Sequence, residues 1–410
     1  MGGRHPGLRL GLVLVACAAL GAGLVHCGGG RYRGYARPTT AAVAAVDLNG
    51  DGRTDLVAAN AFYGGSAFVT VRIQDPAWPG GVQPPLRSSA GSSPGNLAAA
   101  SLGGGARPSL VVANPQLAPM VNPANTVSLL QPDPALSGGF LPPVALALGV
   151  RNPGDVAMGD LNGQGRVAIV VAADGGSDLL LFVQGSTPGS FAAPVSLPVG
   201  GVPAATAMAD LDGDGLLDIV AATSGNLVSV LLQDPAHPGS FLPHVDYPVG
   251  SNPVSVKIAP LAGSGLPDLV VANAGTDLGP TTQGLSILPH DPARPGAFLA
   301  AASYDTLDYA AAGVAVGDLN GDGLLDVAVA NYGLPYSPGS VSVFLQDPGH
   351  PGSFLAPSLY PGYSGPSSIA IGDLNGDGLP DLLTADGGVL ARFQLPGQPG
   401  LFGPLVGYYQ

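Results

Sequence analysis

From about residue 40 onward, short apolar segments alternate with polar turns, and this pattern repeats roughly every 54 residues. In one unit the apolar segments occupy 314–318, 327–330, 341–346 and 354–360. The first two are dense in Val, Ala, Ile and Leu, which predicts strands packed on both faces. After residue 30 no apolar pattern with the 3.6-residue helical period reaches helix length. The pattern therefore predicts four strands per unit in an all-β protein.

Two markers recur with the same count of seven. The first is an Asp-rich loop of nine positions after an apolar strand. It is intact from Asp47, Asp210, Asp318 and Asp373 and degenerate from Ser101, Asp160 and Pro260. The second is a Pro-Gly turn whose copies end at Val82, Phe140, Phe191, Phe241, Phe298, Phe354 and Phe402. Because one blade cannot bury both its faces, we predict a closed seven-bladed β-propeller of four-stranded antiparallel blades over residues 41–410.

Composition agrees with a folded β protein. The chain has 64 Gly and 42 Pro, but 46% of its residues are hydrophobic, which argues against a disordered chain. Its carboxylates are 28 Asp and no Glu, a choice that favours turns and ion-binding loops over helices. The formal net charge of −14 argues against a nucleic-acid partner, because phosphate binding needs a basic face.

The four intact loops carry oxygen ligands in a calcium-like pattern. Side-chain oxygens stand at positions one, three, five and nine, and glycine at position six permits the sharp turn, as in EF-hand loops. The candidate ligands are Asp47, Asn49, Asp51, Asp55, Asp210, Asp212, Asp214, Asp218, Asp318, Asn320, Asp322, Asp326, Asp373, Asn375, Asp377 and Asp381. Position seven would add a main-chain carbonyl from Arg53, Leu216, Leu324 or Leu379. We expect about four Ca²⁺ sites.

Charge repulsion also favours a bound cation. The four loops hold 13 of the 28 Asp, and carboxylates packed that closely are costly without a counterion. Four Ca²⁺ would change the formal charge from −14 to −6. The alternative is that Asp and Asn form side-chain-bonded turns without metal, and Mg²⁺ fits less well because it keeps its waters. Among the degenerate loops, Asp160 and Asn162 are the best weak candidates for a further site.

These loops resemble the FG-GAP/VCBS-type repeat, the calcium-loop blade of integrin alpha-subunit propellers and many bacterial surface proteins. The resemblance covers roughly residues 41–410. It implies structural calcium ions that rigidify the hairpin between the first two strands of a blade, at the ligand positions named above. The motif is specific for calcium and for the blade, and poorly specific for a biological role.

The N-terminus has the pattern of an export signal. Arg4 and Arg9 precede an uncharged apolar run from Leu10 to Val25, which is short for a membrane span and right for a signal peptide. We expect a signal peptide over residues 1–26 and a Gly-rich tether over 27–40. Cys27, followed by three Gly, resembles the first residue of a mature bacterial lipoprotein, although His26 departs from that motif. Lipidation at Cys27 and simple cleavage are both open, so the chain is expected to be membrane-anchored at the outer surface or in the periplasm, or secreted.

Strand parity separates a uniform face from an irregular one. Loops one–two and three–four of each blade share one end, so the Asp-rich loops and the Pro-Gly turns lie together there. The opposite end collects the irregular segments 61–66, 115–125, 274–284, 303–313 and 332–339. Variable loops on a rigid scaffold are frequent binding sites. The side chains that suit a glycan or protein surface there are Tyr63, Asn122, Tyr304, Asp305, Asp308, Tyr309, Tyr332 and Tyr336, and the alternative is that these Tyr only seal loops.

Signals of catalysis are weak. His237, His290 and His350 fall in or beside the Pro-Gly turns and are interpreted as turn residues. No nucleophile motif or phosphate-binding loop is found. The inner-strand positions are interpreted as apolar or Gly, which disfavours a catalytic channel. We expect a non-enzymatic, monomeric binding, adhesion or scaffold module with a glycan or protein ligand, and membrane contact only through a lipid anchor if at all. The alternatives are a propeller enzyme such as a polysaccharide lyase, or a purely structural envelope protein.

Overall fold

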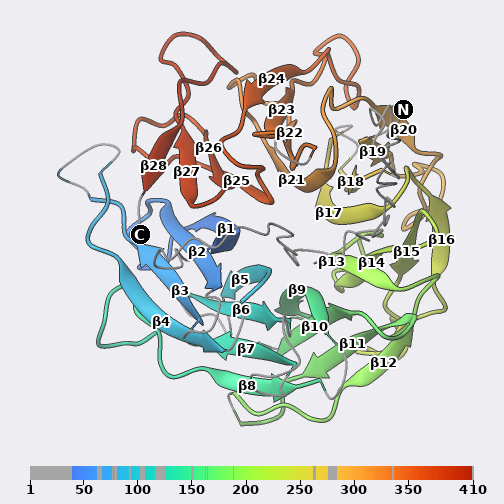
Figure 1. Ribbon diagram of the computed structural model, residues 1–410. Helices are drawn as coiled ribbons and strands as arrows, with labels where there is room; N and C mark the ends of the chain where they lie inside the picture. Colours follow the sequence, from blue (N-terminus) through green and yellow to red (C-terminus); the bar gives the residue numbers. More distant parts are fainter. Residues whose placement is uncertain are drawn as a thin grey trace, which may run out of the picture.

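The computed structural model describes residues 39–408, apart from 62–66, 76, 78–80, 92–93, 102–106, 116–124, 149–151, 162, 164, 188, 262–264, 276–283 and 335–336. Within this part the chain forms 28 strands in seven four-stranded antiparallel sheets, arranged as blades around a central axis (Figure 1). The predicted seven-bladed β-propeller is confirmed. Across the described ranges, no helix is long and apolar enough to cross a membrane. The leader and Cys27 lie outside the described residues.

Each blade consists of four strands that are consecutive in sequence. The inner strands are β1 (Thr39–Val46), β5 (Leu97–Ser101), β9 (Pro153–Asp160), β13 (Pro203–Ala209), β17 (Pro253–Ala259), β21 (Ala311–Gly317) and β25 (Ser368–Gly372). The second strands are β2 (Asp55–Ala61), β6 (Pro108–Asn114), β10 (Val167–Ala173), β14 (Asp218–Thr223), β18 (Asp268–Asn273), β22 (Asp326–Asn331) and β26 (Asp381–Ala385).

The two remaining strands complete each blade toward the rim. The third strands are β3 (Ala67–Arg72), β7 (Thr126–Leu130), β11 (Asp178–Val183), β15 (Leu227–Leu231), β19 (Leu285–Leu288), β23 (Ser340–Phe344) and β27 (Val389–Arg392). The outer strands are β4 (Leu86–Gly91), β8 (Val144–Ala147), β12 (Val195–Pro198), β16 (Val245–Pro248), β20 (Ala302–Tyr304), β24 (Ser358–Pro361) and β28 (Val406–Tyr408).

The outer strand of the sixth blade differs from the expectation. The apolar pattern predicted a strand from residue 354, but Phe354 forms only an isolated bridge with Gln346, and β24 begins at Ser358. In every blade the outer strand begins four residues after this bridge, and no Pro precedes β20 of the fifth blade, so the late start is a feature of the repeat. The inner strand was expected over 314–318 and instead begins at Ala311, because its first residues are small rather than strongly apolar.

The hydrophobic core lies between neighbouring blades. The second strands are its centre, and β6, β10, β14, β18 and β22 are buried along their whole length. One cluster joins Val170 of β10 to Ile219 and Ala221 of β14, so blades three and four share a core. Two-sided burial explains the continuous apolar runs of these strands.

The second marker also packs between blades. Phe298, Phe354 and Phe402 each meet, edge to face, a Tyr on the outer strand of the preceding blade, with ring centroids 5.5–5.6 Å apart. In two of these pairs the Tyr hydroxyl also accepts the main-chain N–H of the Phe, at 3.3 Å. The repeated Phe therefore connects neighbouring blades, and such aromatic pairs stabilise beyond their buried area.

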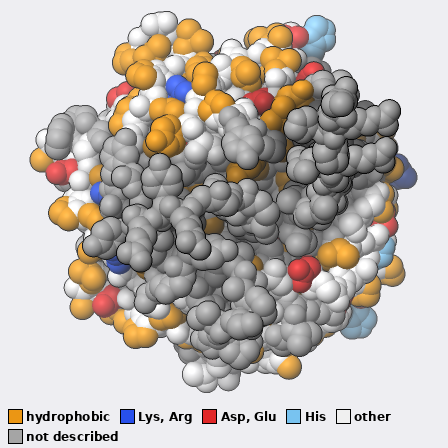
Figure 2. Space-filling view, in the orientation of Figure 1, with side chains coloured by type: hydrophobic (Ala, Val, Ile, Leu, Met, Phe, Trp, Pro, Cys, Tyr) orange, Lys and Arg blue, Asp and Glu red, His pale blue; other side chains and the backbone are white. Residues whose placement is uncertain are grey.

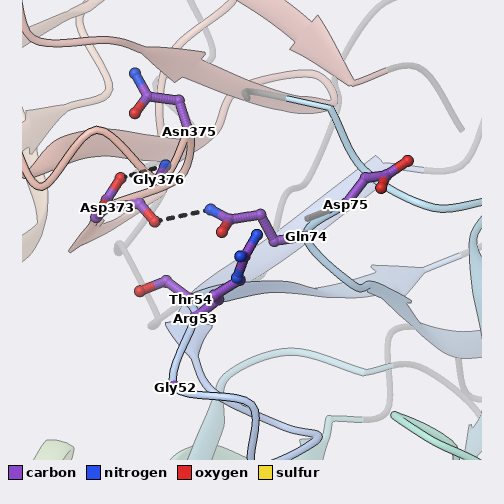
Figure 3. Close-up of a pocket in the computed structure, with 8 residues that line it drawn as sticks. All are labelled: Gly52, Arg53, Thr54, Gln74, Asp75, Asp373, Asn375 and Gly376. Atoms are coloured by element: carbon purple, nitrogen blue, oxygen red, sulfur yellow. Dashed lines mark hydrogen bonds between the residues drawn. The ribbon is translucent and has the colours of Figure 1, made fainter. Parts of the chain in front are cut away.

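The first and last blades meet to close the ring, and neither contributes a strand to the sheet of the other. The first blade uses β1–β4 and the last uses β25–β28, and the two lie side by side in Figure 1. One buried cluster joins Val43 and Leu56 to Leu383 and Tyr408 across this seam. The side-chain amide of Gln74 also donates to the main-chain carbonyl of Asp373 at 3.1 Å (Figure 3). Closure therefore rests on side-chain packing and hydrogen bonds.

The surface shows few charges for a protein of this size. On the face seen in Figure 2, the described Asp, Arg and Lys side chains are scattered, while hydrophobic side chains are spread around the rim. Several apolar residues at the rim belong to outer strands and are 39–55% exposed, among them Val195, Val245, Leu359 and Val406. In this view no single charged patch stands out among the described residues.

Candidate metal centres

The four intact Asp-rich loops each connect an inner strand to the second strand of the same blade. They open the hairpins β1–β2, β13–β14, β21–β22 and β25–β26. The antiparallel order of the strands places them at the same end of the ring as the turns between third and outer strands, as predicted. We call this end the Asp-loop face.

The first Asp of each loop organises the turn. In the sixth blade, Oδ1 of Asp318 accepts the N–H of Gly321 at 2.7 Å, and its Oδ2 accepts the N–H of Gly323 at 3.0 Å. Asp47, Asp210 and Asp373 accept the equivalent pairs at 2.6–2.9 Å. Gly321 and Gly323 have φ values of +76° and +86°, which explains why the motif needs glycine at positions four and six.

The side chains at positions three and five extend this series of side-chain to main-chain hydrogen bonds. Oδ1 of Asn320 accepts the N–H of Asp322 at 2.9 Å, and Oδ1 of Asp322 accepts the N–H of Leu324 at 2.8 Å. The other three loops repeat both bonds at 2.8–3.1 Å. Position seven thus contributes its main-chain N–H to the ladder. The predicted ligand residues at positions one, three and five are brought together in all four loops.

The Asp at position nine occupies a different environment. Asp218 is buried, its Oδ2 accepts the N–H of Leu211 at 2.8 Å, and its Oδ1 accepts the N–H of Gln233 at 2.7 Å. Asp55, Asp326 and Asp381 make the same two bonds. So does Asp268 in the degenerate fifth loop, at 2.9 and 2.8 Å. The ninth Asp therefore joins the loop to the end of the third strand even where the other ligand positions are lost.

Burial makes these ninth-position carboxyl groups poor acids. It raises the pKa of Asp55 and Asp326 to about 6, and that of Asp218 and Asp381 to about 7. Two donated main-chain N–H groups partly oppose the shift in each case. A cation beside the loop would offset the cost of ionising them.

The loop of the fourth blade fits a hard cation best. Carboxylate oxygens of Asp210, Asp212 and Asp218 all lie within 4.8 Å of one another. Two oxygens on opposite sides of one Ca²⁺ would lie about 4.8 Å apart at bond lengths near 2.4 Å. Burial, and the charges of Asp214 and Asp210, raise the pKa of Asp212, as expected for carboxylates packed without a counterion. The residues present therefore fit Ca²⁺.

The degenerate loops keep fewer of these features. Oδ2 of Asp160 still accepts the N–H of Gly165 at 2.6 Å, but Asn162 lies outside the described residues. Residues 102–106 of the second blade's loop also lie outside them. The loop beginning at Pro260 retains only Asp268 of the ligand positions.

Two repeated residues with clear roles were missed by the sequence reasoning. The first is the Leu at loop position two, which is buried between blades in every copy that the structure describes. These are Leu48, Leu161, Leu211, Leu261, Leu319 and Leu374. The second is the Gln at the start of the Pro-Gly turn. Its main-chain N–H donates to the ninth Asp, and its side chain in several blades reaches the preceding blade. Leu stands at position two even in the degenerate loops, and this repetition could have indicated its buried role from the sequence.

On the irregular face, the position of Tyr304 agrees with the alternative interpretation, in which Tyr side chains seal neighbouring elements. Tyr304 belongs to outer strand β20 and packs edge to face against Phe344 and Phe354, so its burial there is structural. Asp308 accepts a hydrogen bond from Ser340 Oγ at 2.6 Å and one from the Tyr309 N–H at 2.8 Å.

The other predicted residues of this face are placed as follows. Asp305 accepts the N–H of Leu307 at 2.8 Å, and Tyr332 donates its N–H to Ala310 at 2.8 Å. The bond from Tyr332 connects the link between blades five and six to the sixth blade, whereas the bond from Leu307 lies within the link. Tyr63, Asn122 and Tyr336 lie outside the described residues.

The inner strands are not wholly apolar, contrary to the sequence interpretation. Asp155 of β9 accepts the N–H of Thr206 on β13 at 3.0 Å. Burial raises the pKa of Asp155, and the charge of Lys257 partly opposes that shift. Lys257, the chain's single Lys, is exposed on inner strand β17. The sequence pattern was assigned to whole apolar segments, so single polar residues within an inner strand were not identified.

Comparison with known families agrees with this geometry. A model of the FG-GAP-like repeat matches residues 160–221, 210–271 and 318–384, and a model of the FG-GAP repeat matches residues 39–71. The matches cover about half of the chain and include all four intact loops. The chain therefore belongs to the FG-GAP repeat β-propellers, a fold consistent with a binding or scaffold module. A search of curated proteins found no match.

Proposed function

We propose that this chain is an exported, calcium-stabilised β-propeller that acts as a binding module at the cell surface. The observation that carries the proposal is the shared geometry of the four intact loops. Each gathers the side chains of positions one, three and five through the same hydrogen-bond ladder. In the fourth blade, three carboxylates approach to the spacing that Ca²⁺ would bridge.

Calcium would act here on stability. The loops join inner strands to the fully buried second strands, so an ion in the loop holds the hairpin at the centre of each blade. It would also neutralise carboxylates whose burial opposes ionisation. An ion that binds only the folded state stabilises it by about 2.7 kcal/mol per site at a hundredfold excess over Kd.

Export is supported by the leader-like residues 1–26, with Cys27 as the candidate lipid anchor. The binding role is supported by the irregular face, where the chain departs from its repeat. A glycan or a protein is a better candidate ligand than a nucleic acid, because the net charge of −14 opposes phosphate.

The calcium proposal is tested by titration calorimetry and thermal unfolding of the mature chain. We expect about four bound Ca²⁺ and a melting temperature that falls when a chelator is added. A melting temperature indifferent to chelator, with no heat of calcium binding, would refute it.

The binding role is tested on a glycan array and on cell-wall polysaccharides, each with calcium and with chelator. We expect retention that depends on calcium. A folded, calcium-loaded chain that retains no glycan would direct the search to a protein partner.

A further inference from the structure

Three segments of the irregular face meet around the sixth blade, which is formed by β21–β24 in Figure 1. They are the link 305–310 that enters this blade, the loop 332–339 between its second and third strands, and the link 362–366 that leaves it. The loop is bonded to the first link, because the Gly333 N–H donates to the Tyr309 carbonyl at 3.0 Å. It is bonded to the second link through the Gly362 N–H and the Gly339 carbonyl, at 2.8 Å. The described parts of the three segments therefore form one continuous surface.

The first link holds Leu307 toward solvent in a strained backbone conformation. Leu307 is 56% exposed and has a φ of +62°, in the left-handed region that a bulky side chain rarely adopts. Oδ1 of Asp305 accepts the Leu307 N–H at 2.8 Å, and the Thr306 hydroxyl donates to the Asp308 carbonyl at 3.1 Å. Strain of this kind persists where surrounding contacts maintain it, and it is concentrated at functional sites.

The second link holds Tyr363 toward solvent. At 73%, it is the most exposed large hydrophobic residue that the structure describes. The two oxygens of buried Asp386 accept the N–H groups of Tyr363 and Ser364, each at 2.6 Å. The links into the fourth and fifth blades have Gly200 and Gly250 at the same position, two residues after the Pro that ends the outer strand. The repeat itself therefore does not need an aromatic ring here.

Tyr332 lies between the two links. Its main-chain N–H donates to Ala310 of the first link at 2.8 Å. Its ring packs against Gly365 of the second link, where an added Cβ would come within 3.2 Å of the ring. We call Leu307, Tyr332 and Tyr363 the blade-six patch. Its side chains come from three segments that hydrogen bonds hold together.

The charge around the blade-six patch is negative. The three segments contain Asp305 and Asp308 and neither Lys nor Arg. Uronic-acid and sulfated glycans would be repelled, and an aliphatic side chain such as Leu307 offers a sugar hydroxyl no hydrogen bond. A complementary partner brings apolar groups and positive charge.

We propose that the blade-six patch binds a protein segment in which apolar side chains are flanked by Lys or Arg. Anchors on a backbone that is already ordered lose little entropy on binding, and Tyr is enriched among the residues that dominate interface energies. The carboxylates at the edge of the patch would attract the basic residues and orient the segment. This surface deepens the proposed binding function, on which it rests, by naming the place and chemistry of a protein ligand.

The test uses the full mature chain, saturated with calcium, and two pools of nine-residue peptides on beads. Both pools have varied apolar residues at the centre. One pool is flanked by Lys and Arg, and the other by Asp and Glu. Nine extended residues span about 30 Å, enough to cross the loop between the two links. We expect retention of the chain by the basic pool and not by the acidic pool.

Variants locate the binding on the patch. Leu307→Gly and Tyr363→Gly should each weaken the tightest basic peptide about tenfold in fluorescence anisotropy. Both should fold, because the φ at Leu307 suits glycine and Tyr363→Gly copies Gly200 and Gly250. Leu355→Ser is the control, because Leu355 is 48% exposed and follows a Pro-Gly turn away from the patch. It should bind as the wild type does.

Three results would overturn the proposal. They are no retention by the basic pool, equal retention by both pools, or wild-type affinity in both Gly variants, which would mean that the net charge of −14 alone attracts the peptides. A neutral oligosaccharide that displaces the peptides and binds Tyr363→Gly more weakly would assign the patch to glycan instead. Failure of the proposed function is read separately. A chain that binds Ca²⁺ and retains polysaccharide, with both Gly variants binding peptide as the wild type does, loses only this surface.

Discussion

The side-chain amide of Gln394 in the seventh blade donates to the main-chain carbonyl of Leu319 in the loop of the sixth blade, at 2.6 Å. Gln233 makes the same bond to Leu161 at 3.0 Å. The Gln that begins each of these turns thus connects its own blade to the Asp-rich loop of the preceding one. Loop geometry and blade packing are therefore coupled.

Replacing Gln394 by Leu should destabilise the fold. The variant loses the donor to Leu319 and to Pro380 and leaves buried carbonyl groups without a partner. We expect a loss of about 1–3 kcal/mol, measured by denaturant unfolding in calcium. Gln398→Leu, at an exposed position in the same turn, is the matched control. Equal unfolding midpoints for the two variants would contradict the role of Gln394.

Asp322→Ala should lower the calcium stoichiometry by one. Asp322 stands at loop position five, where its Oδ1 accepts the N–H of Leu324 at 2.8 Å and its Oδ2 accepts the side-chain amide of Asn320 at 3.0 Å. Titration calorimetry measures the number of sites, and Asp347→Ala, a half-buried turn position in the same blade outside the loop, serves as the control. An unchanged number of sites would refute the assignment of this loop.

Asp268→Ala should act on stability and leave the calcium stoichiometry unchanged. The degenerate fifth loop has no other carboxylate at a ligand position, yet both oxygens of Asp268 accept buried N–H groups. Leaving both donors unpaired should cost about 2–5 kcal/mol in denaturant unfolding. If this variant instead lost one bound Ca²⁺, the ninth Asp would be a ligand by itself and its structural role would be secondary.

Calcium-free protein should be more stable at pH 5 than at pH 8. The folded pKa values of Asp218 and Asp381, about 7, lie above the ordinary value of 3.8. Between these values the folded state holds protons that the unfolded state has released. Stability therefore falls as pH rises from about 4 to about 7 and then levels off.

The pH effect is measured by denaturant unfolding of protein stripped of metal on a chelating resin. Asp218→Asn, which cannot titrate, should flatten the slope relative to the wild type. Saturating calcium should reverse the trend, because the ion binds the ionised carboxylates. A slope that is identical in Asp218→Asn and the wild type would disprove this origin.

The fold was predictable because its signal is repeated. Seven copies of two markers gave the number of blades, and the apolar second strands such as β14 and β22 match the expected two-sided burial. What failed was local. The apolar pattern did not show that Phe354 forms only an isolated bridge before β24 begins, and Tyr304 packs on Phe354 across a blade boundary that no single unit contains.

The candidate metal centres were predictable for the same reason, because their motif is repeated. Only the identity of the converging residues could be predicted, not the role of each one. The spacing of Asp318, Asn320 and Asp322 names the residues that converge. It does not show that Asp326 is buried and bonded to Leu319 and Gln346, because that role depends on the third strand. The hydrogen bond between Gln74 and Asp373 could not be predicted, because these two residues meet only through closure of the ring.

Because every sheet is made of four consecutive strands, a segment of about 54 residues encodes one complete structural unit. Duplicating or deleting such a segment breaks no sheet and changes only the number of blades around the axis. Moving the chain ends to another boundary between blades likewise leaves every ladder intact. The architecture is therefore open to evolution by tandem duplication and to circular permutation, with the seam reassigned to a new pair of blades.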